Sequence, residues 1–384
     1  AACYMDSMAS LDIPAAGYSL CYELGLFRQV IDHGAQREVA DDWRLGASGW
    51  LIPREEDTAE VRFGGHVEEE WDHTGTCRTR LTGYSSIYAV PRDMLITGYG
   101  GRRVNTLRLW EAKSPESLDM YQFSGGDYMR AMERRTMAEV VTKVLYPADD
   151  HPQGKELRLK QQYFFVSATA QDIVRRHRAE WGDVRSFAEH HAIQINDTHP
   201  TLIIPELMRI FMDEDGLGWD EAMKIVCGAV AYTNHTVMSE ALEKWPQGLV
   251  QSLLPRIWQI ICEINLRWVR YLQEQLHGDG EALHRSMILT DGQVHMANLC
   301  QAVCHTVNGV SKLHGEILIR DIFRDVYALR PERYTYVTNG IDHRRWLDQV
   351  NPGLAALTDE LIGPACAKAA LRFSGAISAP EAVK

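Results

Sequence analysis

The sequence has few of the features that mark membrane, secreted or nucleic-acid-binding proteins. No apolar run is long enough to span a membrane and no signal peptide is evident, so we expect no membrane partner. The eight cysteines include no CxxC pair, and we expect reduced thiols in a cytoplasmic protein. Lys and Arg number 40 against 52 Asp and Glu, and the resulting net charge of −12 disfavours nucleic acid as a partner.

Several catalytic signatures are also missing from the sequence. There is no GxxxxGK[ST] loop, which argues against a P-loop nucleoside triphosphatase. Without HExxH or GxSxG, zinc peptidases and serine hydrolases also lack support. No internal repeat or low-complexity linker is visible.

Two short segments have both an ordinary and a functional interpretation. The glycine-rich segment Gly98–Arg103 could cradle a phosphate, but it follows no strand-to-helix signal, so we expect a plain turn. The pair His190-His191 has no carboxylate or cysteine at a ligand spacing, and we therefore favour a solvated loop over a metal site. We predict no bound metal.

What the sequence does contain is typical of a globular protein. Hydrophobic residues make up 45% and charged residues 24% of 384 residues, which suits one large domain with additions, or two domains. The ten tryptophans are mostly expected in the core. The start lacks an initiator methionine and has the pattern of a mid-helix segment, so we expect the chain to begin inside a fold.

The residue patterns predict an α/β protein. Alternating polar and apolar residues predict a strand-rich section at 50–112. From about residue 125, helices alternate with short apolar strands, and this order indicates a parallel sheet covered on both faces. The predicted strands are 192–195, 231–234 and 334–337; the predicted helices open near Pro200 and cover 220–230, with Asp220 as N-cap, 255–275 and 296–313.

Polar clusters follow three of these strands, at 196–199, 233–236 and 338–340. Ligands of open α/β sheets bind outside the carboxyl ends of the strands. The hydroxyl, amide and imidazole groups gathered there suit the many hydroxyls of a sugar. Taken singly, a residue such as Asp197 is as well explained as the N-cap of the next helix. The residues alone therefore predict an α/β protein with a polar crevice suited to carbohydrate.

Whole strings of residues carry the prediction further, because they resemble α-glucan phosphorylases, the glycogen, starch and maltodextrin phosphorylase family. They follow the family's order from residue 1 to about 363. The strings are Asp41–Trp43, Val104–Trp110, Val144–Asp150 with Gly154–Phe164, Gln194–Pro200 with Ile204–Arg209, Ala231–Val237 with Glu240–Trp245, Leu253–Arg256, His295–Cys300, Val307–Val310, and Thr338–Ile341 with Arg344–Leu347.

The resemblance implies a fold of two lobes of the GT-B glycosyltransferase type. Residues 1–363 would form its Rossmann-like N-terminal, glucan-side lobe, with a strand-rich insertion and an incomplete start. Residues 364–384 diverge and are expected to be a poorly ordered tail. The C-terminal lobe, whose lysine holds pyridoxal 5'-phosphate in the family, is not in this sequence, and we expect no activity from the chain alone.

The family's reaction is phosphorolysis of the terminal α-1,4-linked glucose to glucose 1-phosphate with retained configuration. The cofactor's phosphate, rather than its aldehyde, assists the substrate phosphate as a proton donor. The implied partners are an α-1,4-glucan and inorganic phosphate, with a homodimer in the full-length protein. We also expect exposed apolar surface where a second lobe would dock.

The resemblance also assigns site residues, here by position in this sequence only. His235, through its backbone carbonyl, and Asn339 would hold the glucosyl unit. Asp149 would lie in a mobile gate loop that controls entry to the site. The remaining assignments are Asp197 and His199 in the cleft, Tyr232 and Thr236 as supports, and Trp346 near the cofactor.

The sequence departs from the family at the gate and beside Asn339. Ala148 and Asp150 stand where asparagine is common, which removes one hydrogen-bonding side chain and adds a charge. Asp342-His343 replaces the usual Thr-Pro. Two alternatives to a phosphorylase remain: a non-catalytic glucan-binding protein with this surface only, and a nucleotide-sugar glycosyltransferase of the same architecture.

Overall fold

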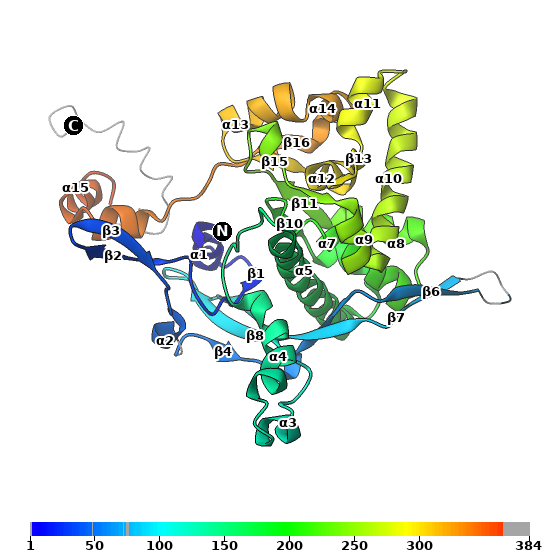
Figure 1. Ribbon diagram of the computed structural model, residues 1–384. Helices are drawn as coiled ribbons and strands as arrows, with labels where there is room; N and C mark the ends of the chain where they lie inside the picture. Colours follow the sequence, from blue (N-terminus) through cyan, green and yellow to red (C-terminus); the bar gives the residue numbers. More distant parts are fainter. Residues whose placement is uncertain (1, 48, 72, 74–76, 364–384) are drawn as a thin grey trace. The chain divides into compact units, whose positions relative to one another are not determined.

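The computed structural model describes residues 2–47, 49–71, 73 and 77–363, and the predicted tail at 364–384 lies outside them (Figure 1). The chain forms two compact units. Unit 1 combines the segments 1–18 and 93–108 with the residues from Asn339 onward, and unit 2 combines 19–92 with 109–338. The mixture of helices and strands confirms the predicted α/β class.

Unit 2 is built on a parallel sheet with the strand order β10-β11-β15-β16. Its strands are β10 (Ile193–Asn196), β11 (Val230–Thr233), β15 (Val307–Gly309) and β16 (Tyr334–Tyr336). Three of them lie where the apolar runs predicted strands. The register pairs Asn196 with Thr233 and Thr233 with Asn308, so the carboxyl ends of neighbouring strands meet at one edge.

The helix predicted at 296–313 is confirmed over its first half and wrong over its second. α12 (Met296–Val303) ends early, β15 follows, and α13 (Lys312–Ile317) begins after the strand. Pairing of Val307–Gly309 between β11 and β16 overrides the helical spacing of the apolar residues. Gly309 permits this path, because a Cβ there would lie 2.8 Å from the backbone nitrogen of Gly315 in α13.

Helices pack around the unit 2 sheet, and the apolar face predicted for 255–275 is confirmed. In α10 (Pro255–Gln275) that face, Ile257, Ile260, Ile261, Ile264, Trp268 and Leu272, is buried. Burying one such side chain fully contributes about 1.5–3 kcal/mol. The other helices include α5 (Pro152–Trp181), α6 (Phe187–His190), α7 (Ile203–Arg209), α8 (Trp219–Ala229), α9 (Gln247–Leu253), α11 (Gly280–Ser286) and α14 (Arg324–Leu329).

We predicted Asp220 as the N-cap of its helix, and this prediction is wrong. The cap of α8 is Gly218, and Asp220 lies in the first turn, where its charge still suits the helix dipole. Its carboxylate accepts a hydrogen bond from Arg267 at 2.7 Å.

The strand-rich section predicted at 50–112 is confirmed. One sheet has the order β1-β9-β8-β4, with β5 pairing β8. Its strands are β1 (Ala16–Leu20), β4 (Ile52–Pro53), β5 (Ala59–Phe63), β8 (Ser85–Thr97) and β9 (Val104–Lys113). The remaining described strands form smaller sheets. β2 (Arg28–Asp32) pairs with β3 (Ala35–Val39), and β6 (His66–Trp71) pairs with β7 (Cys77–Thr82). β14 (Gln293–His295) pairs with both β12 (Lys244–Pro246) and β13 (Leu289–Thr290).

The segment Gly98–Arg103 is the predicted plain turn, because it connects the strands β8 and β9 of this sheet. The backbone N–H groups of Arg102 and Arg103 both donate to Oδ1 of Asp12, at 2.7 and 2.8 Å. The other helices are α1 (Ala2–Ser10), α2 (Arg44–Ala47), α3 (Met120–Ser124), α4 (Tyr128–Glu139) and α15 (Pro352–Ile362).

The His190-His191 pair is only partly the solvated loop that we predicted. His190 is exposed and stacks on Trp181 with ring centroids 4.2 Å apart. His191 packs against Phe187, and burial together with His177 and His190 lowers the pKa of His191 to about 4. Across the described residues, no group of three or more His, Cys, Asp or Glu side chains could hold a metal ion.

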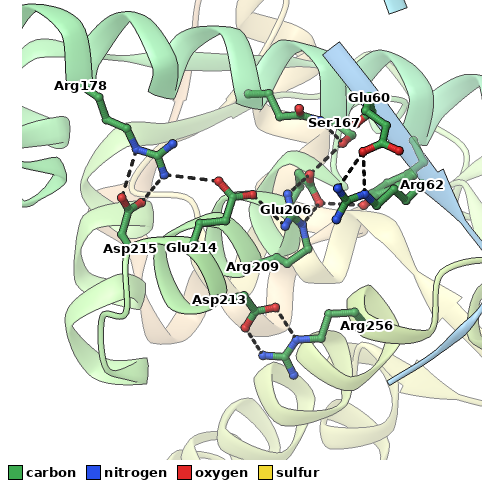
Figure 2. Close-up of polar contacts among 12 residues, drawn as sticks. Glu60, Arg62, Ser167, Arg178, Glu206, Arg209, Asp213, Glu214, Asp215 and Arg256 are labelled. Carbon is green, nitrogen blue, oxygen red and sulfur yellow. Dashed lines mark hydrogen bonds and ion pairs between the residues drawn. The ribbon is translucent and has the colours of Figure 1, made fainter. Parts of the chain in front are cut away.

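A buried ionic network joins α5 to α7 and to the π-helix η4 (Ile210–Glu214) that continues it (Figure 2). The side chain of Glu206 is 0% exposed and accepts hydrogen bonds from Tyr163 and Ser167, each at 2.8 Å. Arg209 donates to both Glu206 oxygens at 2.8 and 3.0 Å, and to Glu214 at 3.0 Å. Every oxygen of the buried carboxylate is therefore paired.

Candidate functional site

A row of polar side chains fixes the carboxyl ends of the unit 2 strands. The Gln194 amide donates to Oγ1 of Thr233 at 2.8 Å, and this hydroxyl donates to Oδ1 of Asn308 at 2.9 Å. One hydrogen-bonded chain thus links β10, β11 and β15. It holds the segments that leave these strands in a defined register.

The turn that follows β11 runs from Asn234 to Thr236 and is held by hydrogen bonds of the Asn234 side chain. Asn234 is 0% exposed; its Nδ2 donates to the Tyr232 hydroxyl and its Oδ1 accepts from the Thr236 N–H, both at 2.9 Å. His235, between these residues, is exposed, and its Nε2 lies 2.9 Å from Oδ1 of Asn196 at the end of β10. Two strand ends therefore present an imidazole and an amide side by side.

Asp197 leads the chain out of β10 with an unusual backbone conformation. Its φ of 65° lies in the left-handed region, which is uncommon for a residue other than glycine. Its N–H donates to the Thr233 carbonyl at 2.9 Å, and its Oδ1 accepts from the Thr198 N–H at 2.6 Å. Asp197 is not a helix N-cap, because α7 begins only at Ile203 with Leu202 as its cap.

His199 pairs with a carboxylate that we did not single out from the sequence. Its Nδ1 lies 3.6 Å from Oε1 of Glu243, which also accepts a hydrogen bond from Gln162 at 2.7 Å. The contact with Glu243 raises the pKa of His199, although burial opposes the rise. Burial alone would raise the pKa of Glu243, but His199 and Gln162 lower it below its ordinary value.

Replacing Glu243 with glutamine is expected to lower the pKa of His199, because the charged partner is lost. The charged pair contributes stability between the lowered pKa of Glu243 and the raised pKa of His199, and this stability is lost as the pH falls through the first or rises through the second. The variant should therefore lose stability mainly in mildly acidic solution, below pH 6.5. An NMR titration of the imidazole measures the pKa directly. Glu240→Gln, at a nearby exposed position, is the matched control, and an unchanged His199 titration in Glu243→Gln would contradict the assignment.

The predicted gate loop connects to this group through Arg158 of α5. The guanidinium donates to Oδ2 of Asp149 at 2.6 Å and lies 5.8 Å from the ring centroid of Tyr146. The Tyr146 ring is in turn 6.3 Å from the His199 ring, centroid to centroid. Asp149, His199 and Arg158 therefore belong to one cluster.

The amino-terminal end of α5 holds the gate loop closely. Nδ1 of His151 accepts a hydrogen bond from the Gly154 N–H at 3.1 Å and so caps the helix. A Cβ at Gly154 would lie 1.8 Å from the carbonyl oxygen of Ala148. Only glycine lets the loop backbone pass this close to the helix.

Asn339 and Trp346 belong to unit 1, and both are exposed. The guanidinium of Arg345 lies 5.2 Å from the Trp346 ring centroid. The unusual Asp342 has a local role, since its Oδ1 accepts a hydrogen bond from the Arg345 N–H at 3.1 Å. Gly340 packs closely on α1, where a Cβ would lie 2.8 Å from that of Cys3.

Some side chains of this site have no separate signal in the sequence. Glu243, Arg158 and Asn196 lie inside the strings that resemble the phosphorylases, but nothing in their spacing marks them as partners of His199, Asp149 and His235. For Glu243 and Arg158 the strings were the only guide, whereas Asn196 also lies in the polar cluster at 196–199. Contacts over such separations depend on the fold.

The fold and the site define an α/β protein with polar side chains gathered at the carboxyl ends of its parallel strands. The comparison with known families names its class. The model of the carbohydrate phosphorylase family matches residues 1–375, past the boundary predicted at Gly363, and the chain belongs to this family. It is 45% identical over 374 residues to the muscle form of glycogen phosphorylase from Homo sapiens. It is 44% identical over 374 residues to the muscle form from Bos taurus and to the brain form from Mus musculus.

The alignments with these relatives cover 94% of this chain but 44% of each relative's length. The chain thus spans less than half the length of the curated relatives it matches. Among the described helices, none has the length and apolar composition needed to cross a membrane.

Proposed function

We propose that this chain forms the glucan-side part of an α-1,4-glucan phosphorylase, which releases terminal glucose as glucose 1-phosphate with retained configuration. The observation that carries the proposal is the strand-end group in which His235 lies 2.9 Å from Asn196 above a turn held by Asn234. Family membership and the glycogen phosphorylases among the relatives support it. The same proposal takes residues 1–363 as the Rossmann-like lobe of a two-lobed GT-B-type enzyme, with 364–384 as a divergent tail.

In the proposed reaction, His235 and Asn339 hold the glucosyl unit that is transferred. Positive charge develops near the anomeric carbon as the glycosidic bond breaks. A fixed carbonyl dipole, such as that of His235, stabilises this charge without reorganising during the reaction. The hydrogen bonds that hold Asn234 and Thr236 keep the dipole in place, and Tyr232 supports them from the strand.

The cluster formed by Asp149, Arg158 and His199, which we call the gate cluster, would control access to the same site. A raised pKa favours the charged form of His199, which would attract phosphate, while Asp197 and Asp149 balance that charge. The pairing of Asp149 with Arg158 at 2.6 Å holds the loop, and breaking it would release the loop. Asp150 adds negative charge to the loop and would disfavour phosphate nearby.

Pyridoxal 5'-phosphate is the proposed cofactor of the whole protein, and it supplies a phosphate that donates a proton to the substrate phosphate. This chain's part in holding it would be Trp346, a residue that is 59% exposed and whose indole suits a planar neighbour. The lysine that carries the cofactor is proposed to lie in a C-terminal lobe outside this sequence. The partners proposed for the whole protein are an α-1,4-glucan, inorganic phosphate and a second copy of itself, in the cytoplasm.

Exposed apolar residues at the end of β16 suit a further lobe. Tyr336 and Val337 are each 48% exposed, and uncovered apolar surface of this kind commonly marks a contact with another part of a protein.

Phosphorolysis by the product of the complete reading frame tests the proposed function. With pyridoxal 5'-phosphate, maltodextrin and phosphate, it is expected to release glucose 1-phosphate, and this chain alone is not. Co-sedimentation with glycogen without any phosphorolysis would overturn the proposal in favour of a non-catalytic glucan-binding protein. Saturable binding of a nucleotide sugar would instead indicate a glycosyltransferase of another specificity.

A further inference from the structure

His314 of α13 contacts the turn that follows β11, and both nitrogens of its ring make hydrogen bonds. The residue is 6% exposed, and its backbone N–H donates to Oγ of Ser311, which caps the helix. Nδ1 lies 3.1 Å from the Val310 nitrogen, and Nε2 lies 3.2 Å from Oδ1 of Asn234. The imidazole thus bridges the backbone after β15 and the turn after β11.

Two backbone donors determine the protonation of this bridge. The Val310 N–H can only donate, so Nδ1 of His314 must accept and carries no proton. The Thr236 N–H can only donate as well, so the Asn234 atom facing it is the oxygen. Nε2 of His314 therefore donates to that oxygen. Burial lowers the pKa of His314 below its ordinary value, which also favours the neutral ring.

The hydrogen bond from His314 bears on the residue that would meet the sugar. Oδ1 of Asn234 accepts from both His314 and Thr236, and these two residues together fix the side chain that spans His235. Without the His314 donor, Asn234 would keep the Tyr232 and Thr236 contacts but lose its tie to α13. The His235 peptide would then be held less firmly.

We propose that His314, as the neutral Nε2–H tautomer, is a positioning residue that holds the His235 turn for the glucosyl unit. This inference rests on the proposed phosphorylase function. His314 does not itself touch the sugar; it acts through Asn234. Histidine suits the position because one rigid ring offers an acceptor to Val310 and a donor to Asn234.

The first arm of the test is NMR of this chain with ¹⁵N-labelled histidine. Long-range proton–nitrogen spectra at neutral pH are expected to show His314 protonated at Nε2 only, with the signal identified by its loss in His314→Asn. A proton at Nδ1, or on both nitrogens, would overturn the proposal. In His314→Asn, the amide signals of His235 and Thr236 are expected to shift, and unchanged signals would also count against it.

The second arm is phosphorolysis by the product of the complete reading frame. His314→Asn removes the donor and is expected to lower kcat by about 10- to 100-fold while the KM for phosphate changes little. His314→Gln, which keeps a donor near the Nε2 position, should recover part of the loss. The exposed His305→Asn is the matched control and should behave as wild type.

These outcomes separate the two proposals. If His314→Asn is as active as wild type, the positioning role is wrong and the phosphorylase function stands. If wild type itself shows no phosphorolysis, the function fails, and the NMR arm still decides whether His314 holds the turn. Should His314→Asn not fold, His314→Gln decides: an unshifted Thr236 amide supports the role of the Nε2 donor, and a displaced turn contradicts it.

Discussion

Replacing Glu206 with alanine is expected to destabilise the protein by about 3–5 kcal/mol, the range observed when one partner of a buried ion pair is removed. The carboxylate is 0% exposed and is the common acceptor for Tyr163, Ser167 and Arg209 (Figure 2). Its removal leaves a mostly buried guanidinium with only the Glu214 contact. It also leaves the buried phenol of Tyr163 without its acceptor.

Urea denaturation of the Glu206→Ala variant measures this effect, and Glu214→Ala is the matched control. Glu214 pairs with Arg209 and Arg178 at the surface, where its side chain is 40% exposed. Its loss should cost less than about 1 kcal/mol. Equal losses in the two variants would mean that the buried carboxylate is no more important than a surface ion pair. Replacing both Glu206 and Arg209 by apolar residues should recover part of the loss.

Replacing Gly154 with alanine is expected to displace the gate loop. The new Cβ would lie 1.8 Å from the Ala148 carbonyl oxygen and 3.1 Å from Cα of Asp149, so the backbone itself must move. This displacement is expected to weaken the His151 cap and the pairing of Asp149 with Arg158. We expect a loss of about 1–3 kcal/mol in stability, the sum of a helix cap and one ion pair.

Gly154→Ala should also slow phosphorolysis by the complete enzyme, because a misplaced loop can reduce a rate about 100-fold. Hydrogen exchange of residues 146–151 would report the displaced loop. Gly248→Ala in α9 is the control, since a Cβ there meets nothing within 4 Å. It should be neutral or stabilising by up to about 1 kcal/mol. A Gly154 variant with unchanged exchange would show that the loop is not held against α5.

The fold was predictable where one local signal was decisive. The apolar spacing in 255–275 marks α10, and the short apolar runs at 192–195 and 334–337 mark β10 and β16. The same reasoning from apolar spacing gave a wrong prediction for the second half of 296–313, because the spacing suits a helix throughout. Only pairing with β11 and β16 turns Val307–Gly309 into a strand. Strand pairing depends on distant residues, so no local pattern could show it.

The site was predictable only in part for a related reason. Polar residues after apolar strands indicated where ligands bind, and they led to Asn196, Asp197 and His235. The partners Glu243 and His314 come from distant segments, and each acts through a contact that the fold creates. Asn339 and Trp346 rest on the family resemblance alone, and their roles stay predictions.

A crystal structure of the product of the complete reading frame with bound glucose tests the central claim most directly. The claim predicts glucose at the carboxyl ends of β10 and β11, with its hydroxyls within hydrogen-bonding distance of His235. Glucose bound elsewhere, with His235 still turned to Asn196 and the strand ends empty, would contradict it.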